Sequence, residues 1–471
     1  MSKNKRNALR PKLDRSASRN VGRSGKEKEV VGKHSSRFGL VSFLADLIDE
    51  LAKFDSPADA VLSNYFKKYS FLGSRDRGIL AEGAYCWLRF RLRINHLAES
   101  GTGGVSLRQA KLALLWSGAS EEVWAKGRPD DNEWLSRVIN INASDLAMEP
   151  KTCLPEWLFT KLQTQFGTER AYIFAASMLK GAPLDIRANT LKSTADDVTR
   201  ALKAEGFNLE PIANLPEGLR VEGKPPLGRT NYFQDGWFEV QDAGSQWVSR
   251  LVAPRRGDLV VDFCAGAGGK TLAIAALMRN TGRIVAIDTS ERRLQKLKPR
   301  AARAGVSNCS TMVINDEADP RLNTYYGKAD RVVVDTPCTG MGTLRRNPDL
   351  KFRQDQHTVA ELVEKQKSII EHAARLVKAD GRLVYITCSV LREENEDIVE
   401  DFLAKNPDFR LRRWVEVLNP NERPDGADQT TDTLRLWPDQ SNSDGFFAAV
   451  LQRSKTAVLA DGVVEATRDE E

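Results

Sequence analysis

One segment, residues 330–340, limits the fold and the chemistry of this chain more than any other. Its positions 332–334 are three valines, a β-branched run that is typical of a strand buried on both faces. Asp335, Pro337 and Cys338 follow directly. A carboxylate and a thiol therefore stand at the carboxyl end of the strand, where open α/β sheets hold their ligands. On its own this pattern also fits a turn with a buried thiol, because free cysteine is usually a core residue.

A second cysteine at the end of a strand favours chemistry over packing. Residues 381–388 again have the composition of a buried strand, and Cys388 is its last residue. A glycine-rich loop of the nucleotide-binding kind lies earlier in the chain, at residues 264–271. Two strand-end thiols beside such a loop indicate covalent catalysis.

Strands and helices alternate from residue 240 onward, and this order predicts a doubly wound, mostly parallel α/β sheet of the Rossmann-like type. Residues 409–414 and 446–452 are predicted as antiparallel edge strands. The predicted parallel strands are 258–263, 283–288, 310–314, 330–335 and 381–388, and the predicted helices are 242–252, 270–279, 291–304, 358–378 and 393–404.

A chain of 471 residues exceeds one ordinary core, so several domains are expected. Apolar residues recur at helical spacing before residue 125, whereas helices and strands mix after residue 150. The predicted division is a disordered basic arm (1–37), a helical bundle with a linker (38–150), a small α+β subdomain suited to RNA binding (151–239), the α/β domain (240–453) and a flexible tail (454–471).

The positive charge of the chain is concentrated at its N-terminus. The net charge is +6, and residues 1–37 hold twelve Lys and Arg against three acidic residues. They contain few large apolar residues, so they cannot bury enough surface to offset the entropy of ordering. A basic arm of this kind fits a polyanionic partner such as RNA, and it fits a solubilising tail equally well.

Composition argues against several classes of protein. No apolar run approaches the roughly 18–20 residues of a membrane helix, and no apolar stretch follows the basic N-terminus as in a secretory signal. Six cysteines without framework spacing indicate reduced thiols and a cytoplasmic protein. The four histidines form no ligand pattern and no CxxC is present, so no metal site is expected.

The glycine-rich loop follows one strand and opens a helix. Glycines let the backbone approach a ligand closely, and the helix N-terminus presents free N–H groups. The loop matches neither GxxxxGK[ST] nor GxGxxG, which weakens a P-loop or dinucleotide interpretation. The loop residues predicted to contact a cofactor are Cys264, Ala265, Gly266, Ala267, Gly268, Gly269 and Lys270.

Two further carboxylates fit a nucleoside ligand. Asp288 ends the next strand, where it can accept both ribose hydroxyls. Asp316 follows the third strand, on the side expected for adenine. With the loop, they resemble the cofactor site of Rossmann-like S-adenosylmethionine methyltransferases. Each has a structural alternative, because Asp288 can cap the following helix and Asp316 can simply form a turn.

Five segments together resemble the RsmB/Nop/Sun family of RNA cytosine-5 methyltransferases, and the resemblance extends over about residues 150–452. The helical bundle more loosely resembles the NusB-like domain of some bacterial members. Three positions depart from the family pattern: Ala267 replaces a usual Pro, Phe352 a usual Trp and Cys153 a common Ser. The five segments are 240–246, 262–271, 335–348, 387–389 and 444–447.

The resemblance implies a class I methyltransferase domain, S-adenosylmethionine as the methyl donor and a cytosine in structured RNA as the substrate. It assigns the attack on C6 of cytosine to Cys388 and a later step, release of the enzyme, to Cys338. Asp335 is expected to bond the N3/N4 edge of the base. Lys270 is expected near the base or its phosphate, and both Lys270 and Asp335 count among the expected cofactor contacts.

The chemistry of cytosine explains why a thiol is needed. C5 of cytosine is a poor nucleophile, and a thiolate that adds to C6 turns the ring into an enamine whose C5 can attack a methyl sulfonium. Arg345 and Arg346, after the Cys338 loop, are suited to RNA phosphates or to a solvated turn. Three arginines of the bundle, at positions 89, 91 and 93, are also possible phosphate contacts.

Several alternatives stay open at this point. Ribosomal RNA is the first expected substrate and transfer RNA the second. The enzyme is expected to be a monomer. A DNA cytosine-5 methyltransferase would attack with Cys338 and would not need Cys388. A non-catalytic RNA-binding assembly factor with a vestigial pocket is a third possibility, and a dehydrogenase is the least favoured.

Overall fold

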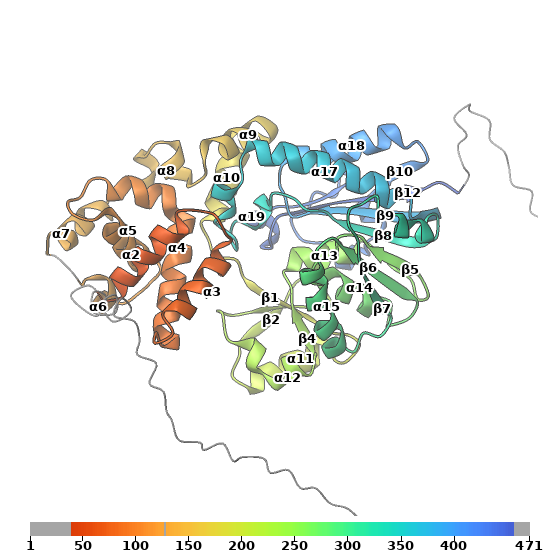
Figure 1. Ribbon diagram of the computed structural model, residues 1–471, viewed down its shortest axis with the longest axis horizontal. Helices are drawn as coiled ribbons and strands as arrows, with labels where there is room; N and C mark the ends of the chain where they lie inside the picture. Colours follow the sequence, from red (N-terminus) through yellow and green to blue (C-terminus); the bar gives the residue numbers. More distant parts are fainter. Residues whose placement is uncertain (1–38, 127–128, 456–471) are drawn as a thin grey trace, which may run out of the picture.

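The computed structural model describes residues 39–126 and 129–455, and it places a helical N-terminal domain beside a larger α/β domain (Figure 1). The small four-stranded sheet lies below them in this view. The predicted basic arm (1–37) and all but the first two residues of the predicted tail (454–471) lie outside the described residues.

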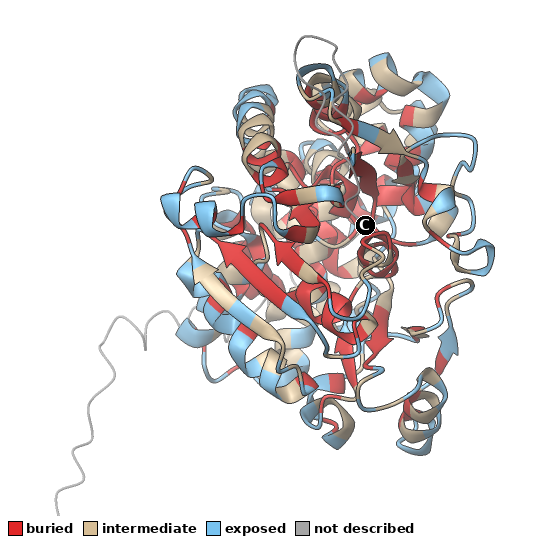
Figure 2. Ribbon diagram, turned by 90° about the vertical axis from the view of Figure 1, so that its right-hand side faces the viewer, coloured by how far each residue is buried: buried red, intermediate tan, exposed pale blue. Residues whose placement is uncertain are grey.

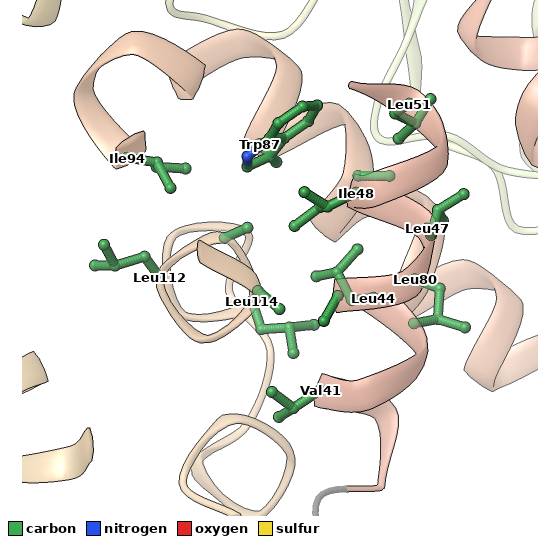
Figure 3. Close-up of a cluster of buried hydrophobic side chains, with 14 of the residues drawn as sticks. Val41, Leu44, Leu47, Ile48, Leu51, Leu80, Trp87, Ile94, Leu112 and Leu114 are labelled. Carbon is green, nitrogen blue, oxygen red and sulfur yellow. The ribbon is translucent and has the colours of Figure 1, made fainter. Parts of the chain in front are cut away.

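The N-terminal domain is held together by apolar faces of three helices. Leu80, Trp87 and Ile94 recur every seven residues along α4, so they share one face, which packs on the faces of α2 and α5 (Figure 3). A Cβ on Gly83 would lie 2.8 Å from a methyl of Leu44, so a glycine is what allows α4 to approach α2 this closely. The helices are α2 (Leu40–Leu51), α3 (Ala58–Lys68), α4 (Ser74–Ala98), α5 (Val105–Trp116), α6 (Glu121–Trp124) and α7 (Pro129–Val138).

The next part of the chain joins two antiparallel helices to a small sheet. The sheet has the order β2-β3-β1-β4 and is antiparallel throughout. Thr194 and Asp197 form a reciprocal capping box that fixes the start of its helix α11. The elements are α8 (Met148–Thr152), α9 (Glu156–Phe166), α10 (Thr168–Met178), β1 (Leu184–Ala188), α11 (Ala195–Ala204), β2 (Leu209–Pro211), β3 (Gly218–Val221), α12 (Asn231–Gln234) and β4 (Phe238–Val240).

The large sheet has the order β10-β12-β9-β8-β5-β6-β7, with β11 paired to β12. Strands β5 to β9 are parallel and the last three are antiparallel, which confirms the predicted doubly wound class. One detail is wrong: residues 446–452 were predicted at an edge, but β12 lies between β10 and β9. The strands are β5 (Leu259–Asp262), β6 (Arg283–Asp288), β7 (Cys309–Val313), β8 (Ala329–Asp335), β9 (Val377–Thr387), β10 (Phe409–Arg412), β11 (Leu434–Leu436) and β12 (Phe446–Arg453).

Helices cover both faces of this sheet, so its central strands are buried (Figure 2). Val332 and Val334 pack with α17 and α18 on one face, whereas Val333 packs with α13 and α14 on the other. None of the helices within residues 39–126 and 129–455 is long and apolar enough to cross a bilayer. The helices are α13 (Ala243–Arg250), α14 (Gly269–Leu277), α15 (Glu291–Ala304), α16 (Leu350–Arg353), α17 (Gln356–Ala374), α18 (Glu396–Lys405) and α19 (Pro438–Ser441).

Buried cationic groups join the helical domain to the α/β domain. The Nζ of Lys351 donates to the carbonyl of Arg89 at 2.8 Å and to that of Cys153 at 2.7 Å. The guanidinium of Arg91 lies 4.9 Å from the ring of Phe54 and 4.8 Å from that of Phe352. Burial lowers the pKa of Lys351 to about 8. Arg91 therefore serves the contact between domains, and a phosphate contact of Arg91 stays a prediction.

We expect Arg91→Ala to lower the free energy of unfolding by about 1–2 kcal/mol, because it removes a guanidinium that contacts two neighbouring rings. Urea denaturation measures the change. The matched control is Arg75→Ala on the exposed part of the same helix, which should stay within about 0.5 kcal/mol of the parent. Equal losses for the two variants would mean that the ring contacts of Arg91 do not stabilise the domain contact.

Candidate active site

The carboxyl ends of five parallel strands meet at one edge of the large sheet and surround a cavity of about 420 Å³. This is the edge at which open α/β sheets bind ligands, and the order of the strands, not their proximity in sequence, brings the residues together. The predicted site residues that line the cavity are Cys264, Ala265, Gly266, Ala267, Gly269, Lys270, Asp288, Asp335, Cys338 and Cys388.

Two glycines of the glycine-rich loop have positive φ angles. Gly266 has φ +55° and its N–H donates to the carboxylate of Asp288 at 2.8 Å. Gly268 has φ +83° at the start of α14, and a Cβ there would lie 2.1 Å from a methyl of Leu297. Gly268 does not line the cavity but shapes the loop. Gly266 and Gly269 face open space, so the loop presents bare backbone to a ligand.

Asp288 borders the cavity and also bonds to the segment that precedes α15. Its side chain is 2 % exposed and lines the cavity, while one oxygen accepts the N–H of Gly266. The other oxygen accepts from the N–H of Ser290 at 2.7 Å and from Arg293 at 3.0 Å. The carboxylate thus ties the loop to the start of α15 and still borders the cavity.

Asp316 is not brought to the cavity. It is exposed, and its carboxylate accepts from the N–H of Ala318 at 2.9 Å, which is the turn geometry named as its structural alternative. Its neighbour Glu317 lines the cavity instead and is paired with Lys365. A cofactor contact of Asp316 stays a prediction.

The two strand-end thiols lie in contact. Strands β8 and β9 are neighbours, with Asp335 opposite Ile386, so the residues that follow each strand emerge side by side. The Sγ atoms of Cys338 and Cys388 are 3.4 Å apart. The hydrogen bond with the Cys388 thiol, and then burial, raise the pKa of Cys338 well above its ordinary value. Cys338 is therefore a protonated thiol at neutral pH.

A third thiol in the cavity is unsuited to nucleophilic attack. Cys264 lies in the glycine-rich loop, and burial raises its pKa well above the ordinary value. The nearby carboxylates of Asp335 and Asp288 raise it further, because they disfavour a second negative charge. Cys264 therefore lines the cavity as a neutral thiol.

Lys270 and Asp335 form an ion pair between the loop and the thiols, with 2.6 Å from Nζ to Oδ2. Burial alone would lower the pKa of Lys270, but the Asp335 carboxylate outweighs it and the net shift is upward. Lys270 is therefore cationic. The side chain of Asp335 is 34 % exposed, so it remains accessible from the cavity.

The arginine pair after the Cys338 loop is used inside the protein. Arg345 is 4 % exposed and donates to the carbonyl of Ser443 at 2.6 Å, so the predicted phosphate contact is wrong for this residue. Arg346 bridges Asp242 at 3.2 Å and Asp444 at 3.0 Å. Both side chains fasten the loop to the neighbouring strands.

Sequence reasoning missed Glu394, a buried carboxylate next to the thiol loops. It stands within the run Arg-Glu-Glu-Asn-Glu-Asp at 392–397, which has the composition of a solvated helix start. A sequence pattern cannot indicate that only one acid of this run faces inward. The bonds that Glu394 makes are described below.

We expect Gly268→Ala to lower the free energy of unfolding by about 1–3 kcal/mol, since alanine is strained at φ +83° and its methyl would overlap Leu297. Gly269→Ala is the matched control. A Cβ there meets nothing within 4 Å, so this variant should stay within about 1 kcal/mol of the parent. Urea denaturation measures both, and a larger loss for Gly269→Ala would contradict the account of the loop.

Comparisons with known proteins agree with this architecture. The family described as 16S rRNA methyltransferase RsmB/F matches residues 249–452, and its ferredoxin-like domain matches residues 154–227. A probable ribosomal RNA small subunit methyltransferase B of a Synechocystis species is 33% identical over 315 residues, 67% of this chain and 70% of that one. Ribosomal RNA small subunit methyltransferase B of Photorhabdus laumondii is 30% identical over 360 residues, 76% of this chain and 77% of that one.

Solved structures extend the similarity to the fold. The crystal structure of PH0851 covers 88% of this chain and 98% of its own, with a TM-score of 0.71 and 26% identity. A methyltransferase homologue of Pyrococcus horikoshii covers 66% of this chain and 100% of its own, with a TM-score of 0.57 and 28% identity. The similarity extends over most of the chain and agrees with the sheet order, the glycine-rich loop and the strand-end residues. The protein therefore belongs to the RsmB/F family of methyltransferases.

Proposed function

We propose that this protein transfers a methyl group from S-adenosylmethionine to C5 of a cytosine in ribosomal RNA, through a covalent bond between Cys388 and C6 of the base. The observation that carries the proposal is the contact of two thiols at 3.4 Å in the same cavity as the glycine-rich loop. The names of the relatives, ribosomal RNA small subunit methyltransferases, support RNA of this class as the substrate.

The residues around the loop fit a nucleoside cofactor. The bare backbone at Gly266 and Gly269 leaves room for a ligand, and Asp288 borders the cavity with a carboxylate that can accept ribose hydroxyls. Glu317, with its partner Lys365, lines the same cavity. S-adenosylmethionine bound there supplies an electrophilic methyl group on a sulfonium.

Cys388 performs the attack. Its sulfur adds as a thiolate to C6 of cytosine, and the electron pair of the C5–C6 bond becomes available at C5 for methyl transfer. The hydrogen bond with the Cys388 thiol and burial raise the pKa of Cys338. The family resemblance assigns the attack to Cys388, whereas the DNA-type order would assign it to Cys338.

Cys338 acts after methyl transfer. When C5 loses its proton, the C5–C6 double bond re-forms and the Cys388–C6 bond breaks, with its electron pair returning to the Cys388 sulfur. The Cys338 thiol lies 3.4 Å from that sulfur and can donate a hydrogen bond to the leaving thiolate. Cys338 therefore assists release of the enzyme from the methylated base.

Asp335 faces the base. The covalent adduct has N–H groups at N3 and N4, from which a carboxylate can accept hydrogen bonds. The accessible Asp335 lies beside the two thiols. Lys270 pairs with this carboxylate at 2.6 Å. The target cytosine must leave its stack to reach this cavity, which favours loops and bulges of the RNA.

We expect Cys388→Ala to abolish both methylation and the covalent adduct, because it removes the nucleophile. Cys338→Ala should still form the adduct but release it slowly, so a protein–RNA complex that survives denaturing electrophoresis should accumulate. Mapping 5-methylcytosine in ribosomal and transfer RNA from cells with and without each variant measures methylation and identifies the RNA.

The reverse result would overturn the assignment. If Cys388→Ala still methylates while Cys338→Ala is inactive and forms no adduct, the nucleophile is Cys338. If the modified cytosine is lost from transfer RNA and not from ribosomal RNA, the substrate is wrong while the chemistry stands.

The pKa of Cys338 gives a pH test. Its thiol is alkylated only as the thiolate, so the rate of its reaction with iodoacetamide should keep rising beyond pH 9.0, the ordinary value, and its midpoint should lie above it. In Cys388→Ala the midpoint should fall, because the first cause of the shift is removed, although burial keeps it raised. Mass spectrometry of the Cys338 peptide across pH measures both midpoints. A midpoint below 9.0 in the parent would contradict the description of Cys338 as a protonated thiol.

A further inference from the structure

A buried carboxylate lies directly behind the two thiols. Glu394, at the end of the short 3-10 turn Arg392–Glu394 that follows β9, is 0 % exposed. Each donor that the described residues supply to it is neutral, so it is no ion pair: Thr339 N at 2.8 Å, Thr339 Oγ1 at 2.5 Å, Gln366 Nε2 at 3.0 Å and Ser389 Oγ. A carboxylate in this position is stable only while these four bonds persist.

These donors belong to both thiol loops. Thr339 is the residue after Cys338, and Ser389 is the residue after Cys388. Their hydroxyls are 3.3 Å apart and both donate to the same carboxylate oxygen. One carboxylate therefore joins the two loops at the positions next to the two sulfurs.

A third element is fastened at the same point. Gln366 on α17 donates to the carboxylate of Glu394 and also to the carbonyl of Pro337 at 2.9 Å. The loop that carries Cys338 is thus held from both sides of the thiol, by Pro337 before it and by Thr339 after it. Movement of either loop would break bonds to a buried carboxyl group and leave buried polar atoms without partners, which costs free energy.

We propose that Glu394 is a positioning residue that holds the Cys338 and Cys388 thiols at contact distance. It touches neither the base nor the cofactor cavity and acts through Thr339 and Ser389. Its consequence for catalysis depends on the proposed function, in which one thiol attacks and the other assists release on the same base. A displacement of about 1 Å between reacting groups is enough to slow such a step by an order of magnitude or more.

Glutamine at this position should preserve the arrangement. Its amide oxygen can accept from the N–H of Thr339 and from Gln366, and its amide nitrogen can donate to the two hydroxyls, which can rotate to accept. Alanine removes the acceptor that these donors share. A backbone bond from Gly342 N to Cys388 O at 2.8 Å joins the loops further on, so alanine should slow but not abolish the meeting of the thiols.

The first experiment measures the thiol contact without RNA or cofactor. Diamide oxidises two adjacent thiols to a disulfide and takes up their two protons and two electrons, and mass spectrometry follows the peptide pair that contains Cys338 and Cys388. We expect Glu394→Ala to slow this pairing about tenfold and Glu394→Gln to stay within about threefold of the parent. Unchanged pairing in a folded Glu394→Ala protein would overturn the proposal.

Two further variants separate positioning from loss of stability. Thr339→Val keeps the shape of the side chain but removes one hydroxyl bond to the carboxylate, so pairing should slow even if Glu394→Ala does not fold. Asp258→Ala removes a buried carboxylate at the opposite edge of the sheet, where it accepts the N–H of Arg255 at 2.8 Å. This control should lower the melting temperature without slowing the pairing. Slower pairing in Asp258→Ala, or parental pairing in Thr339→Val, would also overturn the proposal.

The second experiment measures release of RNA and separates the two proposals. Glu394→Ala should form the Cys388 adduct and release it more slowly than the parent, whereas Glu394→Gln should release it at nearly the parental rate. If pairing slows but the parent enzyme and Cys338→Ala form no RNA adduct, positioning by Glu394 stands and the proposed function fails. If the adduct forms and resolves alike in the parent and Glu394→Ala, the positioning role fails and the proposed function stands.

Discussion

The hydrogen-bonded pairing of β8 with β9 is the interaction on which the rest of this site depends. The strands are parallel neighbours, so their carboxyl ends open at the same edge of the sheet. Cys338 and Cys388, fifty positions apart in sequence, therefore meet at 3.4 Å. The glycine-rich loop after β5 opens at the same edge, because β5 is the other neighbour of β8. One pairing order thus brings two thiols and a nucleoside-type loop around a single cavity.

The segment that carries Cys338 also joins the other parts of the molecule. Beyond the thiol, Arg346 pairs with Asp242 and Asp444. Lys351 donates to the carbonyls of Arg89 in the helical domain and of Cys153 after α8. Between Cys338 and Arg346 the chain passes close to Gly445. A Cβ on Gly342 would lie 2.2 Å from the carbonyl oxygen of Gly445, so this approach requires a glycine. The position of a reactive sulfur is therefore determined by bonds on several elements, most of them buried.

The regular part of the α/β domain was predictable, because β-branched runs and helical periodicity report directly on burial. The residues misread from sequence are those in irregular loops, where no period indicates which way a side chain points. Arg345 looks like a phosphate contact but is buried, and Glu394 looks solvated but bonds two loops. Strand β12 was placed at an edge because pairing order is not written in local composition. Asp316 shows the same limit, since the sequence left open whether it forms a turn, and its carboxylate accepts from the N–H of Ala318.

The measurement that tests the central claim most directly is the identity of the cysteine that bonds to RNA in the unaltered enzyme. An RNA substrate in which the target cytosine carries fluorine at C5 cannot lose a proton there, so the adduct should persist after methyl transfer and survive digestion. Sequencing the peptide attached to the modified nucleotide by mass spectrometry should find the bond at Cys388. A bond at Cys338, or no covalent complex although the RNA is bound and the cofactor is present, would contradict the account.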